Sequence, residues 1–234
     1  MKEKIVGIIG GMGPEATVDL MNRIIKGTSA SDDADHIRMI VDNNPKVPSR
    51  IKALLEGGGE DPAPCLQEMA RKLHAWGADF LVIPCNTAHY YHTKVQEVVP
   101  VPVLNMIRLT CEEVSHLEPD LKTIGLLAST AVLNIGLYKK EFQSFGVNVL
   151  NPADEIQCLV MDIIRKIKTS NYGAEVVETF QLAVNHLLDS GAQGLLIACT
   201  ELSMFTSAIQ SEKPVFDSAQ VLAESIIKEV KGSL

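Results

Sequence analysis

Two stretches of the chain read GADFLVIPCNT, over residues 77–87, and GAQGLLIACTE, over residues 191–201. Each begins with a Gly-Ala pair, continues through an apolar run, and ends on a cysteine that polar residues follow. Short, continuous apolar runs between helical patterns are typical of strands buried in a parallel sheet. Cys85 and Cys199 would then lie just past the carboxyl ends of their strands, where open α/β sheets place ligand-contacting groups.

The similarity of the two stretches is part of a longer internal repeat. The apolar segment 5–9 matches 123–127, and the x-Pro-Val segment 101–104 matches 213–216. The separations are 118 residues between Gly7 and Gly125, 114 between Cys85 and Cys199, and 112 between Pro102 and Pro214. Nearly constant separations predict two similar α/β domains related by a pseudo-two-fold axis. The alternative is that α/β chains reuse such strand–turn patterns without a repeat.

Strand and helix patterns alternate along the whole chain, which predicts an α/β fold with parallel sheets covered on both faces. The expected strands are residues 5–9, 36–42, 80–84, 101–106, 123–128, 147–150, 194–198 and 214–216. We expect a first domain of residues 1–101 plus 214–234, a second domain of residues 102–213, and an active site in the cleft between them.

Composition and charge narrow the class of protein. The 234 residues are 46% hydrophobic, which allows a normal core, and the net charge of −8 argues against a nucleic-acid partner. Apolar runs no longer than a strand argue against a membrane partner, and the first residues show no secretory cleavage site. We therefore expect a cytoplasmic protein with five reduced cysteines, whose spacing predicts no metal site.

The matched cysteines have an ordinary alternative, because free cysteines are often simply buried. We interpret Cys65, Cys111 and Cys158 in that way, since they lie inside helix patterns. Cys85 and Cys199 instead each end a strand where a helix is expected to begin, a position that favours the thiolate. Two thiols that form no disulfide suit proton exchange at one carbon, one acting as base and the other as acid on the opposite face.

Two loops of the first half hold further candidates. The turn GGMGP at residues 10–14 lacks the spacing of a dinucleotide fingerprint, and we expect it to bring backbone N–H groups and Met12 near a small anion. Arg50 closes the loop NNPKVPSR at residues 43–50. An arginine there is either a bidentate clamp for a carboxylate or a solvated surface residue.

Other polar residues lie beside the thiols or at matching turns. Asn86, Thr87 and Thr200 can donate hydrogen bonds next to the cysteines, and Thr130 occupies the turn that corresponds to Met12. Lys168 ends a helix pattern, where a cation is favourable for local reasons alone. His89 and His92 share a helix pattern without a third ligand, so we expect a surface or capping role rather than a metal site.

Together these residues resemble the cofactor-independent aspartate/glutamate racemase family, and the aspartate racemase branch most of all. The resemblance runs over nearly the whole chain. It rests on IIGGMGP at residues 8–14, on NNP at residues 43–45 with Arg50, on PCNTAH at residues 84–89, and on ACTE at residues 198–201. Glutamate racemases share the two cysteines but typically open with an acidic residue after the first strand.

The resemblance implies racemisation of an acidic amino acid without pyridoxal phosphate or another cofactor, by a cytoplasmic homodimer. Cys85 and Cys199 would serve the two faces of Cα. Met12, Asn86, Thr87, Thr130 and Thr200 would line the site. Arg50 would bind one carboxylate and Lys168 the other, although the residues after Lys168 depart from the family pattern.

Two other functions remain open at this stage. One is another superfamily reaction on a dicarboxylate, such as maleate isomerisation, which solvent deuterium entering Cα would distinguish from racemisation. The other is a non-catalytic amino-acid-binding protein on the same scaffold, for which the loss of one thiol would be the discriminating feature. This sequence keeps both thiols.

Overall fold

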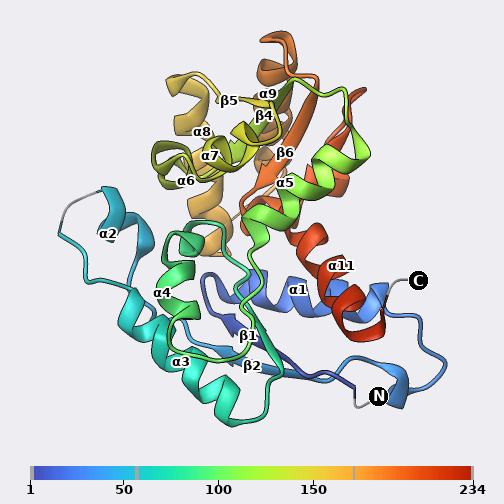
Figure 1. Cartoon of the computed structure of the whole chain (residues 1–234). Helices are drawn as coiled ribbons and strands as arrows, with labels where there is room; N and C mark the ends of the chain where they lie inside the picture. Colours follow the sequence, from blue (N-terminus) through green and yellow to red (C-terminus); the bar gives the residue numbers. More distant parts are fainter. Residues whose placement is uncertain (1–2, 56–57, 171, 233–234) are drawn as a thin grey trace. The chain divides into compact units, whose positions relative to one another are not determined.

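The computed structural model describes residues 3–55, 58–170 and 172–232 (Figure 1). The chain divides into two compact units, which we describe separately. Unit 1 comprises Met1–Leu109 and Gln220–Leu234, and unit 2 comprises Thr110–Ala219. Each unit is built on a parallel sheet, so the prediction of an α/β fold with parallel sheets is confirmed.

The sheet of unit 1 has the strand order β2-β1-β3. Its strands are β1 (Val6–Gly10), β2 (Met39–Asn43) and β3 (Phe80–Val82). The helices of this unit are α1 (Pro14–Gly27), α2 (Arg50–Leu55), α3 (Ala63–Ala75), the 3₁₀ helix η2 (Thr87–Tyr91), α4 (His92–Gln96) and most of α11 (Ser218–Lys231), together with the 3₁₀ helix η1 (Asp33–Asp35). In β1, alternate residues enter two separate apolar cores, one containing Ile9 and one containing Val6 and Ile8, as expected of a sheet covered on both faces.

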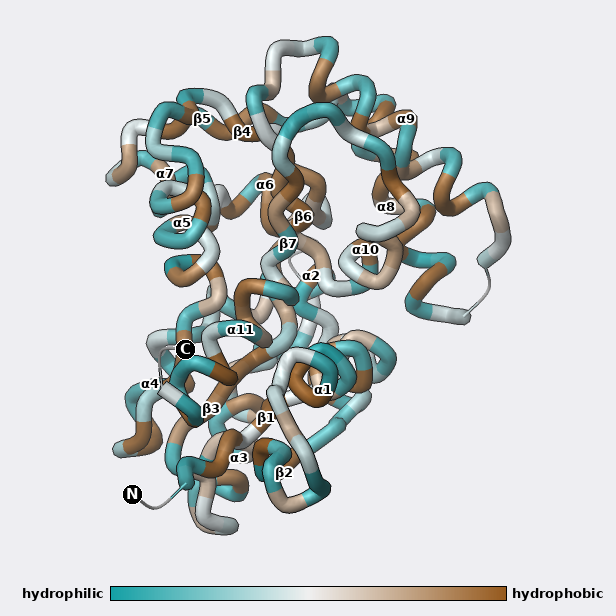
Figure 2. Tube along the Cα trace, turned by 90° about the vertical axis from the view of Figure 1, so that its right-hand side faces the viewer, coloured by the Kyte–Doolittle hydropathy of each residue, from teal (hydrophilic) through white to brown (hydrophobic). Residues whose placement is uncertain are grey.

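The sheet of unit 2 has the strand order β5-β4-β6-β7. Its strands are β4 (Thr123–Ala128), β5 (Asn148–Leu150), β6 (Gly194–Ala198) and β7 (Val215–Asp217). The helices are α6 (Thr130–Ile135), α7 (Leu137–Gln143), α8 (Asp154–Lys168), α9 (Glu175–Asp189), α10 (Thr200–Ser203) and the 3₁₀ helix η3 (Thr206–Ala208), while α5 (Met106–Leu117) begins in unit 1 and continues in unit 2. Figure 2 shows β1 and β6 as largely hydrophobic segments, in agreement with the full burial of both strands.

The two units repeat each other in register as well as in strand order. Gly7 pairs with Leu81 between β1 and β3, and Gly125 pairs with Leu195 between β4 and β6. A Cβ atom on Gly7 would lie 2.5 Å from the Leu81 side chain, and one on Gly125 would lie 2.9 Å from that of Leu195. Equivalent glycines therefore let equivalent leucines pack across the sheet.

Two features of the repeat differ from the sequence-based expectation. Residues 101–106 form no strand: Val103 makes only an isolated parallel bridge to Leu81, and α5 already begins at Met106. The matching segment 213–216 contributes the full strand β7, which pairs with β6 inside unit 2. Residues 214–219 therefore belong to unit 2, and the divisions fall after Leu109 and after Ala219 rather than after residues 101 and 213.

Two segments are divided into consecutive short helices. The segment that follows Cys85 is the 3₁₀ helix η2 followed by the short α-helix α4. Gly136, with a left-handed backbone (φ 69°), separates α6 from α7. In the part of the chain that the structure describes, no helix is both long and apolar enough to cross a membrane.

Candidate active site

Cys85 lies three residues beyond the end of β3 and is 6% exposed. Its N–H donates to the carbonyl of Ile83 at 2.8 Å, so a tight backbone turn carries the thiol away from the strand. Cys85 and Met12 belong to one buried apolar cluster of unit 1. Two of the predicted site residues therefore share one packed environment.

Asn86 and Thr87 follow Cys85 directly and are 3% and 9% exposed. Thr87 begins η2, and the carbonyl of Asn86 accepts a hydrogen bond from the N–H of His89 at 3.1 Å. Both polar side chains are thus buried beside the thiol. This burial agrees with a role in lining a site, because exposed loop positions would have left these side chains in solvent.

The turn after β1 is fixed by close contact with the loop after β2. Gly11 has a φ of +92°, and a Cβ atom at this position would lie 2.2 Å from the backbone of Asn44. The N–H of Gly11 donates to Thr17 Oγ1 at 2.9 Å. The N–H of Gly11 therefore holds the turn itself together, and Met12 is placed as a buried side chain.

Arg50 begins α2, and neighbouring backbone carbonyls hold its guanidinium. Its NH₁ group donates to the carbonyls of Val47 at 3.3 Å and Pro48 at 3.1 Å, and its NH₂ group lies 3.5 Å from the Met12 carbonyl. Among the described residues no carboxylate pairs with it, and its buried Nε has no hydrogen-bond partner. An oriented cation in this state can accept a carboxylate from a ligand.

Cys199 is the N-cap residue of α10 in unit 2 and is 6% exposed. Its Sγ donates to Glu201 Oε2 at 3.1 Å. Burial raises the pKa of the Cys199 thiol well above its usual range, the negative charge of Glu201 raises it further, and the charge of Lys168 opposes this effect. Cys199 is therefore a thiol at rest, with a carboxylate already in contact with its proton.

Lys168 is the last residue of α8, and its Nζ lies 3.3 Å from Glu201 Oε1. The contact is an ion pair rather than an aligned hydrogen bond, because Oε1 has no hydrogen-bond partner among the described residues. The Lys168 side chain is 34% exposed, whereas that of Glu201 is 7% exposed. The structure thus joins Lys168, Glu201 and Cys199 in one charged cluster of unit 2.

Thr130 and Thr200 occupy the first turns after β4 and β6. The hydroxyl of Thr130 accepts from Gln157 Nε2 at 3.2 Å, and the same amide group donates to the Ala128 carbonyl at 3.0 Å. Gln157 is buried, and its Oε1 has no hydrogen-bond partner among the described residues. Helix α8 therefore supports the turn that carries Thr130, a role for Gln157 that no sequence pattern indicated.

His89 was expected to have a surface or capping role, and the structure gives it a capping role from a buried position. It is buried rather than on a helical surface, with Nδ1 2.9 Å from the Cys85 carbonyl and Nε2 3.0 Å from the N–H of Met106. Since Nε2 must accept from that N–H, the proton of the neutral ring lies on Nδ1 and is donated to the Cys85 backbone carbonyl. Burial lowers the pKa of His89 to about 4, which keeps the ring neutral.

His92 likewise bonds to the backbone, with Nε2 2.7 Å from the Val103 carbonyl. Within residues 3–55, 58–170 and 172–232, no three His, Cys, Asp or Glu residues are grouped so that they could hold a metal ion. All five cysteines are free thiols.

Comparison with known proteins places this geometry in a family. Residues 9–226 match the sequence model of the family described as "Asp/Glu/Hydantoin racemase". A Picrophilus torridus aspartate racemase is similar in structure, with a TM-score of 0.85 and 33% identity over 99% of this chain and 96% of its own. The broad specificity amino-acid racemase RacX of Bacillus subtilis is 29% identical over 95% of this chain and 96% of its own. An aspartate racemase homologue from Pyrococcus horikoshii shares the fold, with a TM-score of 0.76 and 24% identity over 97% of this chain and 99% of its own.

Proposed function

The chain belongs to the Asp/Glu/hydantoin racemase family, and we propose that it interconverts the enantiomers of an acidic amino acid. Aspartate is the first candidate substrate and glutamate the second. The observation that carries the proposal is the matched pair of buried free thiols, one after β3 and one after β6. The similarity to the Picrophilus aspartate racemase favours aspartate, and the similarity to RacX is the reason to test other amino acids as well.

In the proposed mechanism Cys85 and Cys199 serve opposite faces of Cα. The thiolate of one cysteine takes the Cα proton, and the electron pair of the broken C–H bond passes toward the α-carboxylate. The thiol of the other cysteine then gives its proton to the opposite face and is left as the thiolate. The reverse direction exchanges the two roles, so atoms, protons and charge balance without oxidation or reduction.

Arg50 is the residue that we assign to one substrate carboxylate. Its guanidinium is oriented by three carbonyls and paired with no described carboxylate, which supports this assignment. A bound cation also stabilises the negative charge that develops on the substrate when Cα is deprotonated. We assign Lys168 to the other carboxylate, because a third of its side chain remains exposed beside Glu201.

Five residues complete the proposed site. Met12, Asn86, Thr87, Thr130 and Thr200 line it as short polar or flexible apolar side chains, four of them buried. Glu201 adds a function in the mechanism: its Oε2 is the acceptor to which the Cys199 proton can pass before this cysteine acts as base. The reaction requires no cofactor, and we propose a homodimer in the cytoplasm.

The test of the proposal is incubation of the reduced protein with L-aspartate in deuterated buffer. Circular dichroism follows the loss of optical activity, and mass analysis counts the deuterium gained at Cα. Decay of the signal with one deuterium gained per inversion supports two-base racemisation, and the same assay with L-glutamate ranks the substrates. If both amino acids keep their optical activity and their hydrogen, the proposed substrate class is wrong; an isomerised dicarboxylate such as maleate would then identify the other reaction.

A further inference from the structure

The residue four positions after each cysteine binds the carbonyl of that cysteine. In unit 1 the Nδ1 of His89 donates to the Cys85 carbonyl at 2.9 Å. In unit 2 the backbone N–H of Ser203 donates to the Cys199 carbonyl at 3.0 Å. The first connection uses a side chain and the second a backbone N–H, with Ser203 Oγ also 3.3 Å from the same carbonyl. The spacing of four residues is the same in both units and is a second feature of the internal repeat.

Each connection continues to the N-terminus of a helix. Nε2 of His89 accepts the N–H of Met106, the first residue of α5, at 3.0 Å. Because an N–H in the first turn of a helix has no partner within the helix, His89 acts there as a cap supplied by a distant residue. One buried imidazole thus joins the cysteine carbonyl directly to the start of α5.

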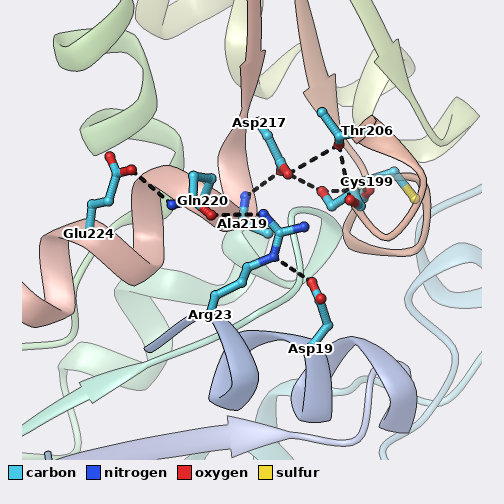
Figure 3. A network of polar contacts seen from close by, with 9 residues as sticks. Asp19, Arg23, Cys199, Thr206, Asp217, Ala219, Gln220 and Glu224 are labelled. Carbon is cyan, nitrogen blue, oxygen red and sulfur yellow. Dashed lines mark hydrogen bonds and ion pairs between the residues drawn. The ribbon is translucent and has the colours of Figure 1, made fainter. Parts of the chain in front are cut away.

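In unit 2 a serine and an aspartate make the corresponding connection. Ser203 Oγ donates to Asp217 Oδ1 at 2.5 Å, and this oxygen also accepts the N–H of Ala219, in the first turn of α11, at 2.9 Å. The second carboxylate oxygen accepts from Thr206 Oγ1 at 3.2 Å. Figure 3 shows Asp217 between Ala219 and Thr206, with Cys199 on the same side of Asp217 as Thr206.

These two helices, α5 and α11, are the ones in which the chain passes from one unit to the other. The divisions between units fall after Leu109, within the first turn of α5, and after Ala219, within the first turn of α11. Each cysteine turn is therefore bonded to the start of the helix by which the chain leaves its own unit.

We propose that His89 and the Ser203–Asp217 pair are positioning residues, each of which fixes the turn that carries one of the two thiols. This inference rests on the proposed function for its effect on catalysis but not for its effect on the thiols. A displaced general base loses much of its rate, and misplacement by about 1 Å can cost about 10²-fold. Each substitution is expected to act on the cysteine of its own unit alone.

The first experiment measures the two thiols without any substrate. Iodoacetamide is applied to the full chain, and mass analysis of peptides gives separate alkylation rates for Cys85 and Cys199. His89→Leu, which removes both bonds, is expected to speed alkylation of Cys85 several-fold and leave Cys199 unchanged. Ser203→Ala is expected to do the reverse. His92→Leu and Thr206→Val are the matched controls, since His92 bonds to Val103 and Thr206 to the far oxygen of Asp217.

The second experiment uses L- and D-aspartate deuterated at Cα. In one direction Cys85 removes the deuterium, and in the other direction Cys199 does. A slower Cys85 step therefore raises the isotope effect for one enantiomer and lowers it for the other, and a slower Cys199 step gives the opposite pattern. His89→Leu should reproduce the pattern of Cys85→Ser, and Ser203→Ala that of Cys199→Ser, with kcat falling by about 10²-fold and KM little changed.

The outcomes separate the two proposals. If the cysteine variants show no opposed isotope patterns, the two-base function fails, while the alkylation rates still decide the positioning role. If His89→Leu changes both thiols equally, or neither, the positioning role is overturned. Should His89→Leu not fold, His89→Gln replaces it, because a glutamine oxygen can accept the Met106 N–H and should restore part of the kcat if positioning is the role.

Discussion

The two halves of this chain share a backbone plan but surround their thiols with different chemistry. Cys85 lies in an apolar cluster with Met12, and the neutral ring of His89 bonds to its carbonyl. Cys199 instead donates directly to a buried carboxylate, which a lysine neutralises in part. The repeat thus places the two cysteines at equivalent positions, while the charged side chains beside Cys199 have no counterpart in the contacts described for Cys85.

The largest effect is expected from removing either thiol. Cys85→Ala and Cys199→Ala should each lower aspartate racemisation by about 10³-fold or more, because each leaves one face of Cα without a proton donor or acceptor. Cys111→Ala is the matched control: Cys111 is buried but lies within α5, so its loss should cost stability and not chemistry. Full activity in either the Cys85 or the Cys199 variant would show that this thiol has no part in catalysis.

The second prediction tests whether the equivalent glycines Gly7 and Gly125 contribute equally to the free energy of unfolding. Gly7→Ala and Gly125→Ala should each destabilise the protein by about 1–3 kcal/mol, the range for overpacking a core. The larger cost is expected at Gly7, where the new Cβ would lie 2.5 Å from Leu81 Cδ2, against 2.9 Å from Leu195 Cδ2 at Gly125. Urea unfolding of both variants gives the comparison. A negligible cost at one glycine and a large one at the other would show that the two packings are not equivalent.

The strands of the two sheets and their register are the part of the molecule that the sequence predicts well. Apolar runs, Gly-Ala pairs and constant separations report strand burial and register, and these depend on the local pattern alone. The prediction of a strand at residues 101–106 is wrong. The pattern of this segment matches that of residues 213–216, which do form a strand, but α5 begins at Met106 and ends the extended segment early. Where a helix starts depends on its caps, and here the cap of Met106 comes from His89, seventeen positions earlier.

The site was predicted less completely than the fold. The motifs indicated Cys85, Cys199 and Arg50. The contacts of Glu201 form only when α8 packs against α10, and those of Gln157 only when α8 packs against the turn after β4. His89 was expected to have a surface or capping role; it caps the start of α5, but nothing in the local pattern indicated that it does so from a buried position. Contacts between distant elements leave no periodic trace in the sequence.

The third prediction concerns the contribution of His89 to the pH dependence of the free energy of unfolding. Burial lowers the pKa of His89 to about 4 from an ordinary 6.5, so the unfolded chain binds this proton more readily than the folded one. The contribution to stability is therefore full above pH 6.5 and is lost as the pH falls toward 4. Between pH 7 and pH 5 the loss should be about 2 kcal/mol.

Urea unfolding at the two pH values measures that loss. His89→Gln does not titrate and should show a pH dependence that is shallower by the same amount. An equal slope in both proteins would mean that the imidazole becomes protonated in the folded state as easily as in the unfolded chain, and that it is less buried than described.

The smallest expected effect is a change in the pKa of the Cys199 thiol when its charged neighbours are replaced. Glu201→Gln keeps the size of the side chain and removes its charge, so the thiolate of Cys199 no longer faces a carboxylate. The pKa of Cys199 should fall, yet stay above its usual range, because burial is the larger cause of the shift and is unchanged. Lys168→Met removes the opposing cation and should raise the pKa instead.

The measurement is the pH profile of iodoacetamide alkylation, resolved by peptide for each cysteine. The Cys199 profile should move to lower pH in Glu201→Gln and to higher pH in Lys168→Met, while the Cys85 profile in the same samples stays in place as the internal control. Movement of both profiles together would indicate a general loosening of the fold. No movement of Cys199 would show that Glu201 does not influence its proton, and the chemical difference between the halves would then reduce to burial alone.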